Sequence, residues 1–206
     1  MTLLRRLAAE GIGSLLLAAT VIGSGVMAER LAAGNSAVAL IANTGATVAV
    51  LAVLIALLAP VSGAHFNPAV SLLQALRRAM PWHEAGAYGL VQVVGCCLGA
   101  ILAHAMFGLP LLQASLHARS GPAQWLSEAV AAWIGAAYWF TASTSFANPA
   151  ITIARSLSNT FAGIRPQDVP AFIISQLIGG SAAYYAACRL FSLPVKMQPA
   201  DLERRY

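Results

Sequence analysis

The chain has 206 residues, of which 59% are hydrophobic and only 9% are charged. Soluble domains carry about 25% charged residues, so this chain has too little polar material to cover a water-facing surface. The same composition excludes a disordered chain, which needs low hydrophobicity and high charge. The net charge of +5 does not indicate a nucleic-acid partner, because the basic residues stand between apolar runs, as in the loops of membrane proteins.

Five stretches without a charged residue are long enough to hold membrane-spanning helices, which need about 18 or more apolar residues. These stretches are 11–28, 31–76, 85–118, 129–154 and 169–188. They do not alternate in the way that the strands of a membrane barrel do, so the sequence predicts an all-α integral membrane protein. In chain order we expect spans at about 7–27, 38–58, 85–107, 126–145 and 169–191.

Two short apolar elements interrupt this pattern. The first follows the helix breakers Pro60 and Gly63 and is too short to cross a membrane before the basic pair at 77–78. Asn67 is a favourable N-cap and Pro68 a favourable first-turn residue, so we expect a half-helix to begin there. The second short element begins with the same three residue types, at 148–150.

The two short elements belong to an internal repeat. Each half has a Glu at the start of its first span, then Asn-Pro-Ala, then a Gln inside its last span. These residues are Glu10, Asn67 and Gln92 in the first half and Glu128, Asn148 and Gln176 in the second. Paired interrupted helices in matching halves indicate a substrate site near the membrane midplane.

At these residues the sequence resembles the aquaporin or major intrinsic protein family. The resemblance rests on Ser62-Gly63-Ala64-His65-Phe66-Asn67-Pro68-Ala69-Val70 and on Phe146-Ala147-Asn148-Pro149-Ala150. It implies an aquaporin-like inverted repeat of transmembrane helices, with two re-entrant half-helices that meet at mid-membrane, and six spans in an ordinary member. The pore motif that it implies consists of Asn67, Pro68, Ala69, Asn148, Pro149 and Ala150.

The chemistry of a channel fits these residues. Each half-helix N-terminus carries roughly half a positive charge, so two of them at the pore centre repel cations. The two Asn side chains can donate hydrogen bonds to a passing oxygen, and pore width and lining donors set selectivity. The sequence has neither a Ser/His/Asp set nor a metal-ligand spacing. We therefore expect a passive channel, not an enzyme, with no cofactor and no metal site.

The expected selectivity filter departs from the water-selective pattern. Water-favouring members of the family have Arg directly after the second Asn-Pro-Ala, whereas this chain has Ile151, and the nearest Arg is Arg155, roughly 6 Å further along the helix. By analogy, the other filter and pore-wall candidates are Thr47, Ala136, Ser145 and His65. Such a constriction is wide and weakly polar, so we expect small uncharged solutes such as glycerol, urea or metalloid acids. The alternative for Ile151 and for His65 is a packing role.

The second half of the repeat is short. Glu10 precedes Asn67 by 57 residues, but Glu128 precedes Asn148 by only 20. The difference corresponds to about one span and a loop, so we expect five spans instead of six, with a junction at 132–134.

The basic clusters bear on the same question, because positive residues prefer the inside. Two expected spans separate the arginine pair at 5–6 from the pair at 77–78, so both pairs can lie inside. The basic tail at 189–206 can also lie inside only if an even number of spans separates it from the pair at 77–78. Either this tail lies outside, or the segment 129–145 does not cross as a normal span.

We expect one membrane channel domain over 1–206, with a first repeat at about 1–108 and a shortened second repeat at about 119–206. The resemblance implies a homotetramer in a bacterial-type inner (plasma) membrane. Two alternatives remain: a non-conducting remnant whose deletion destroyed the pore, and a secondary transporter, which shares inverted repeats and broken helices. A transporter needs a coupling acid near the midplane, whereas Glu10 and Glu128 begin spans and are expected to hold loop backbone.

Overall fold

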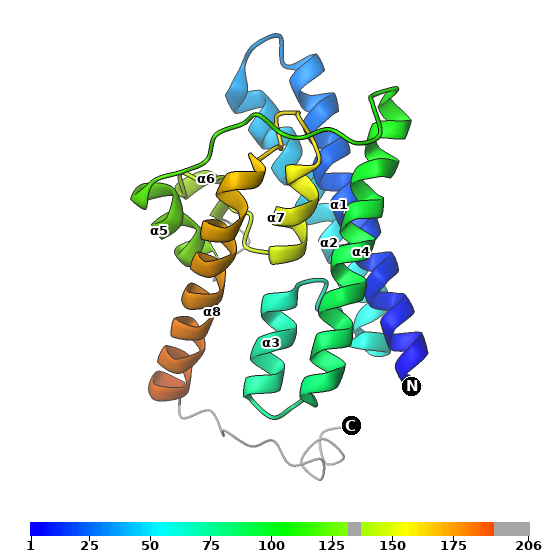
Figure 1. Ribbon diagram of the computed structural model, residues 1–206, viewed down its shortest axis with the longest axis vertical. Coiled ribbons are helices and arrows are strands. Elements are labelled where there is room, and N and C mark those ends of the chain that lie inside the picture. The colour runs from blue at the N-terminus through cyan, green and yellow to red at the C-terminus, as the bar shows by residue number, and fades with distance from the viewer. Residues whose placement is uncertain (132–136, 192–206) are drawn as a thin grey trace.

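The computed structural model describes residues 1–131 and 137–191, and every regular element within these ranges is helical. The elements are α1 (Leu3–Leu31), α2 (Ser36–Ser62), α3 (Pro68–Leu76), α4 (Trp82–Phe107), α5 (Pro122–Ala131), α6 (Ala137–Phe140), α7 (Pro149–Ser156), η1 (Pro166–Asp168) and α8 (Val169–Phe191). Helices α1, α2 and α4, and η1 together with α8, are long and apolar enough to cross a membrane. The all-α membrane fold is therefore confirmed (Figure 1).

The second span extends further than its sequence predicts. Asn35 caps α2 by accepting two backbone N–H groups of the first turn. The helix then continues through Pro60 and ends at Gly63, whose φ of 90° is a left-handed conformation that favours glycine. Pro60 does not end the helix because it stands in the last turn, where the Gly63 N–H still closes a bond of 2.9 Å to the Ala59 carbonyl.

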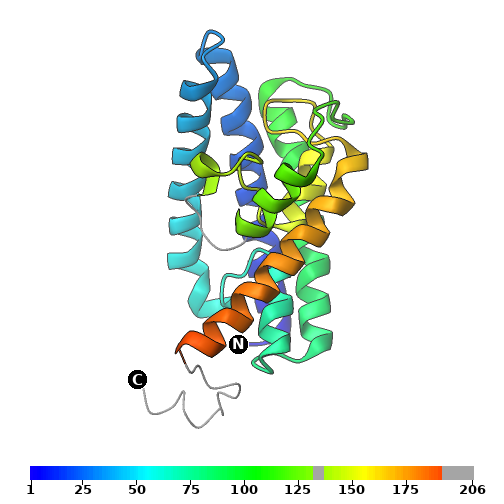
Figure 2. The ribbon, with the colours of Figure 1, turned by 90° about the vertical axis from the view of Figure 1, so that its left-hand side faces the viewer.

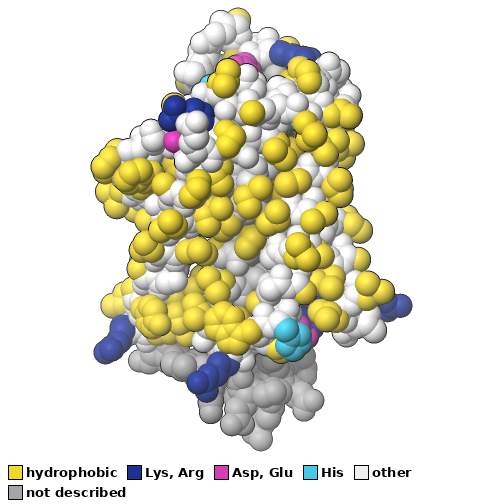
Figure 3. Space-filling model, in the orientation of Figure 1, with side chains coloured by type: hydrophobic (Ala, Val, Ile, Leu, Met, Phe, Trp, Pro, Cys, Tyr) yellow, Lys and Arg dark blue, Asp and Glu magenta, His cyan; other side chains and the backbone are white. Residues whose placement is uncertain are grey.

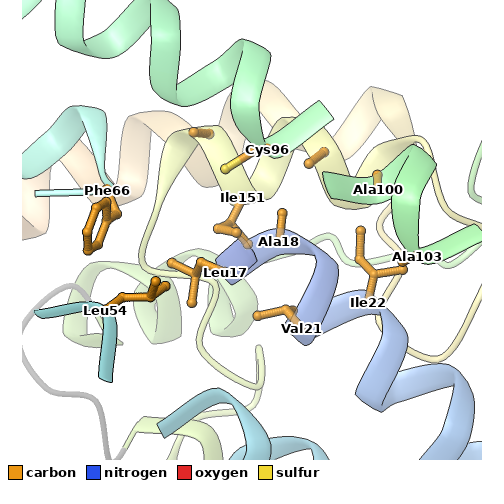
Figure 4. Close-up of a cluster of buried hydrophobic side chains, with 12 residues drawn as sticks. Leu17, Ala18, Val21, Ile22, Leu54, Phe66, Cys96, Ala100, Ala103 and Ile151 are labelled. Atoms are coloured by element: carbon orange, nitrogen blue, oxygen red, sulfur yellow. The ribbon is translucent and has the colours of Figure 1, made fainter. Parts of the chain in front are cut away.

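Glycines allow the helices to pack closely. A Cβ atom at Gly95 or Gly99 in α4 would collide with carbonyl groups of α1, and one at Gly179 in α8 would collide with the backbone of α5. The main apolar cluster lies where α1 and α4 meet α7, and it includes Leu54 of α2 and Phe66, which precedes α3 (Figure 4). Its labelled members are Leu17, Ala18, Val21, Ile22, Leu54, Phe66, Cys96, Ala100, Ala103 and Ile151.

The two short elements are re-entrant half-helices, as the sequence predicts. Helices α3 and α7 both begin near the middle of the molecule and run in opposite directions, α3 toward the end that holds the N-terminus and α7 away from it (Figure 1). Asn67 and Asn148 are the N-caps, and Pro68 and Pro149 are the first helical residues. Both caps and both prolines are therefore as expected.

The expected span over 126–145 is not a continuous crossing helix. On either side of the residues that are not described, α5 and α6 are only 10 and 4 residues long. The Ala142 N–H donates to Ser127 Oγ at 3.1 Å, so residue 142 lies beside a residue that is 15 positions earlier in the chain. A straight helix would separate the two positions by about 22 Å. The predicted junction at 132–134 lies outside the described residues.

The return of the chain before α7 bears on where the basic clusters lie. Four of the described helices are long and apolar enough to cross a membrane, and α8 ends at the same end of the molecule as the N-terminus (Figures 1 and 2). The basic pair after α3 lies at this end too. Apolar side chains cover the middle of the face in Figure 3, with Lys and Arg toward its two ends. The tail beyond residue 191 lies outside the described residues.

Candidate functional site

The two half-helices are joined at their N-termini by their capping residues. Asn67 Oδ1 accepts the Ala69 N–H at 2.9 Å, while its Nδ2 donates to the Ala147 carbonyl at 2.8 Å. Asn148 Oδ1 accepts the Ala150 N–H at 3.0 Å, while its Nδ2 donates to the Phe66 carbonyl at 2.8 Å. The two motifs, far apart in the sequence, therefore meet end to end.

A buried carboxylate holds the loop before the first half-helix. Glu10 accepts the backbone N–H groups of His65 and Phe66 at 2.9 and 2.7 Å, and also the Ser62 hydroxyl at 2.7 Å. Gln92 donates to the same carboxylate at 2.8 Å. Glu10 thus holds loop backbone, as expected.

The second half repeats this network. Glu128 accepts the N–H groups of Phe146 and Ala147 at 2.8 and 3.0 Å, and Gln176 donates to it at 2.6 Å. Gln176 also donates to the Thr152 hydroxyl at 2.9 Å, just as Gln92 in the first half donates to a serine hydroxyl. The internal repeat seen in the sequence is therefore also a repeat of hydrogen bonds.

These carboxylates hold backbone that is otherwise unfavourable. Ala64 and Phe66 have φ of 51° and 48°, and Ser145 and Ala147 have φ of 48° and 50°. A non-glycine residue in this left-handed region costs on the order of 1–3 kcal/mol. The strained loops turn their N–H groups toward Glu10 and Glu128, so bonds to a charged acceptor offset the strain.

A cavity of about 360 Å³ lies against the joined N-termini. Its lining residues are Leu17, Val21, Thr47, Leu51, Ile55, Ala64, His65, Phe66, Asn67, Val70, Ala131, Tyr138, Ser145, Phe146, Ala147, Asn148 and Ile151. Most of these side chains are apolar, and the two asparagines are among the few that can donate a hydrogen bond. An amide group has two N–H donors, and each asparagine uses one of them on the opposite loop.

The cavity brings together three of the five filter candidates. Thr47, Ser145 and Ile151 all line it. Thr47 donates its hydroxyl to the Asn43 carbonyl at 2.8 Å, so its oxygen can accept from a solute. Ile151 also belongs to the main apolar cluster, so it both packs and lines the cavity. Ala136 lies outside the described residues.

Of the two remaining candidates, His65 lies at the cavity and Arg155 does not. His65 lines the cavity, with Nδ1 3.0 Å from Ser71 Oγ and its ring 5.3 Å from that of Tyr88. Arg155 does not line the cavity. It is buried, its guanidinium carbon lies 3.4 Å from the centroid of the Phe146 ring, and its Nε donates to the Ala162 carbonyl.

The sequence analysis assigned no role to two residues at or near the cavity, Phe146 and Arg119. Phe146 occupies the place in the second half that His65 has in the first, 81 positions earlier, as the Glu–backbone bonds show. Arg119, in the loop before α5, donates to the carbonyls of Gly163 and Ser143 at 2.8 and 3.2 Å and lies over the Phe146 ring. Extending the repeat beyond its polar residues could have found Phe146, whereas no local pattern marks Arg119.

The sequence of the chain is similar to those of known proteins. A family model described as "Major intrinsic protein" matches residues 1–131, and so ends at the last residue of α5. The chain is 49% identical to the aquaglyceroporin AqpS of Rhizobium meliloti over 96% of its own length and 92% of the relative. It is 34% identical to the probable glycerol uptake facilitator protein of Thermotoga maritima over 47% of this chain and 41% of that one.

A solved structure supports the fold. The X-ray structure of the aquaglyceroporin from Plasmodium falciparum matches with a TM-score of 0.67 over 94% of this chain and 99% of that one, at 15% identity. The alignment with the Rhizobium protein runs over 222 positions, more than the 206 residues of this chain. The relative therefore carries residues, within the aligned region, that this chain lacks.

Proposed function

The chain belongs to the major intrinsic protein family, and from this premise we propose that it is a passive membrane channel for water and small uncharged, glycerol-type solutes. The observation that carries the proposal is the exchange of hydrogen bonds between Asn67 and Asn148 beside a cavity that both residues line. Each amide keeps one N–H for a solute oxygen. Passage of this kind moves a solute without changing its covalent bonds.

We place the solute path along the cavity wall that Thr47, Ser145 and Ile151 share. An aliphatic side chain after the second motif leaves more room than an arginine and offers no charge. Solutes with both carbon atoms and hydroxyl or amide groups match a wall that is largely apolar with a few hydrogen-bonding groups. We therefore propose that glycerol- and urea-sized molecules pass, with metalloid acids in the same class.

We further propose that the pore motif is Asn67, Pro68, Ala69, Asn148, Pro149 and Ala150, in one channel domain made of a first repeat and a shortened second repeat. The protein is proposed to lie as a multi-pass homotetramer in a bacterial-type inner membrane. Light scattering of the purified protein in detergent tests the oligomeric state, and a monomer would contradict it.

The decisive experiment is stopped-flow light scattering of proteoliposomes under a glycerol gradient and, separately, under an impermeant osmolyte that reports water flux. Thr47→Trp places an indole in the cavity and is expected to abolish both fluxes. Val48→Trp is its matched control, because the neighbouring side chain is 52% exposed on the outer face of α2. Glycerol flux no higher than in empty liposomes would contradict the proposal and favour the non-conducting alternative.

A further inference from the structure

Two arginine side chains contact the same aromatic ring of the cavity wall. The guanidinium carbon of Arg155 lies 3.4 Å from the centroid of the Phe146 ring, and that of Arg119 lies 5.1 Å from it. Phe146 itself lines the cavity, whereas neither arginine does. The ring that both guanidinium groups contact is therefore part of the cavity wall.

Neither guanidinium forms a salt bridge among the described residues. The Arg119 side chain donates to three backbone carbonyls and to the Thr144 hydroxyl, all of them neutral acceptors. Buried Arg155 donates through Nε to a carbonyl, and one of its terminal nitrogens has no hydrogen-bond partner within the described part of the chain. Most buried donors in proteins have a hydrogen-bond partner, so this terminal nitrogen of Arg155 is an exception.

The nearby acids are engaged elsewhere. Asp168 accepts the backbone N–H of Arg119 at 2.6 Å, but its carboxylate is paired with Arg165 at 3.1 Å. Glu128 holds the two loop N–H groups and Gln176. Asp168 is balanced by Arg165, which leaves the one negative charge of Glu128 against the two positive charges of Arg119 and Arg155. A net positive charge therefore remains behind Phe146.

The other half of the repeat does not have this excess. His65 occupies the place of Phe146 there and lies against the Tyr88 ring. Arg6, which lies over the same Tyr88 ring, is paired with Glu84. The carboxylate of Glu10 also lies at this side, on the His65 N–H. The charge imbalance is therefore specific to the Phe146 side of the cavity.

We infer that Arg119 and Arg155 act together, through Phe146, as an electrostatic barrier that keeps cations out of the channel while neutral solutes pass. The inference rests on the proposed function and deepens it by assigning two specificity-determining residues. It supplies a fixed positive charge that Ile151 does not provide at the position after the second motif. A field from charges inside the protein is screened much less than one at the surface, so the arginines do not have to touch the solute.

The test compares two planar permeants of similar size and different charge, urea and guanidinium, in proteoliposomes. Urea permeability is measured by stopped-flow light scattering, and guanidinium uptake by radiolabel. We expect Arg119→Gln and Arg155→Gln each to raise the guanidinium-to-urea permeability ratio by about tenfold, since one fixed charge acting at this range is worth on the order of one decade. Arg119→Lys and Arg155→Lys keep the charge and are expected to keep the ratio low.

Arg30→Gln is the matched control. Arg30 also lies 5.1 Å over an aromatic ring, that of Phe107, but this pair does not line the cavity, so the ratio should not change. The permeability ratio corrects for differences in the amount of folded protein. Each arginine has its own neutral variant and its own charge-keeping variant, so the two positions are tested separately. If both neutral variants conduct urea and still exclude guanidinium as well as the unchanged chain does, the barrier is refuted. If the unchanged chain conducts no urea or glycerol, the proposed function fails first, and the barrier falls with it.

Discussion

Asn67 and Asn148 exchange hydrogen bonds across the centre of the molecule. Each side chain donates to the backbone carbonyl of the residue that directly precedes the other asparagine, at 2.8 Å in both cases. Each also caps its own half-helix through Oδ1. One amide group therefore fixes a helix start, fixes the opposite loop and retains one N–H, which an aspartate or a serine in its place could not do.

Asn148→Asp separates these tasks. Aspartate caps a helix as well as asparagine does, but it cannot donate to the Phe66 carbonyl and places a carboxylate against it. We expect glycerol flux to fall by about tenfold or more and the Tm to fall by several degrees, since about 1–3 kcal/mol of stability is lost when a buried partner is left unsatisfied. Stopped-flow swelling and a thermal unfolding scan measure the two effects. Asn35→Asp, which changes an exposed N-cap of α2 without a cross-link, should leave both values unchanged; equal losses in the two variants would show that only capping matters.

Glu10→Gln tests the support of the first loop. Glu10 accepts four hydrogen bonds from Ser62, His65, Phe66 and Gln92, and a glutamine would turn an N–H group toward some of these donors. The left-handed residues of the loop would then lose the contacts that offset their strain. We expect a loss of about 2–4 kcal/mol and a lower Tm, together with loss of glycerol flux.

The control for this variant is Glu29→Gln. Glu29 is exposed and accepts a single N–H, from Phe161 at 3.2 Å, so its neutralisation should change the Tm by no more than about one degree. A Glu10→Gln protein that unfolds at the temperature of the unchanged chain would show that the carboxylate charge is dispensable for the loop.

Ile151→Arg tests the width of the proposed filter. Ile151 lines the cavity, so a long side chain with five N–H donors should narrow it and bind passing oxygens. We expect glycerol flux to fall by about tenfold relative to water flux. Ile151→Leu keeps the volume and the apolar character and should leave the ratio near that of the unchanged chain. An unchanged ratio in Ile151→Arg would place the constriction elsewhere.

Sequence patterns predict those features of this fold that depend on local chemistry. Asn67 and Asn148 are N-caps followed by proline, and these features together with the repeat were enough to place both half-helices. The two Glu residues could be matched because each half needs one carboxylate for two loop N–H groups.

Other features depend on contacts that no local pattern encodes. The sequence of 126–145 is apolar enough for a span, but the Ala142 N–H donates to Ser127 Oγ, a tertiary contact that no local pattern predicts. Arg155 was expected near the filter by helical spacing, yet its guanidinium turns behind Phe146 instead. Arg119 reaches the same ring from a loop, so its part could be recognised only in three dimensions.

Gly99→Ala tests the close contact of α1 and α4. A methyl group at Gly99 would collide with the Leu15 carbonyl and the Ala19 nitrogen, which are backbone atoms and cannot move without separating the helices. We expect a loss of about 1–3 kcal/mol, read as a lower Tm in detergent. Gly45→Ala is the control, because nothing lies within 4 Å of a Cβ atom there and alanine is the better helix former, so its Tm should stay constant or rise slightly. Equal Tm values for the two variants would contradict the packing argument.

The last prediction concerns the side of the membrane on which α8 ends. We expect the four candidate spans to cross the membrane, so that the start of α1 and the end of α8 lie on one side and the loop between α4 and α5 lies on the other (Figure 1). Single cysteines at Leu4, Leu190 and Leu116, which are 77%, 75% and 75% exposed, can report these positions in a background with Cys96, Cys97 and Cys188 replaced by alanine. A membrane-impermeant maleimide added to right-side-out and inverted vesicles should label Leu4→Cys and Leu190→Cys from the same side and Leu116→Cys from the opposite side. Labelling of Leu190→Cys from the side of Leu116→Cys would mean that the segment before α7 crosses the membrane after all, and that the basic tail overrides the positive-inside preference.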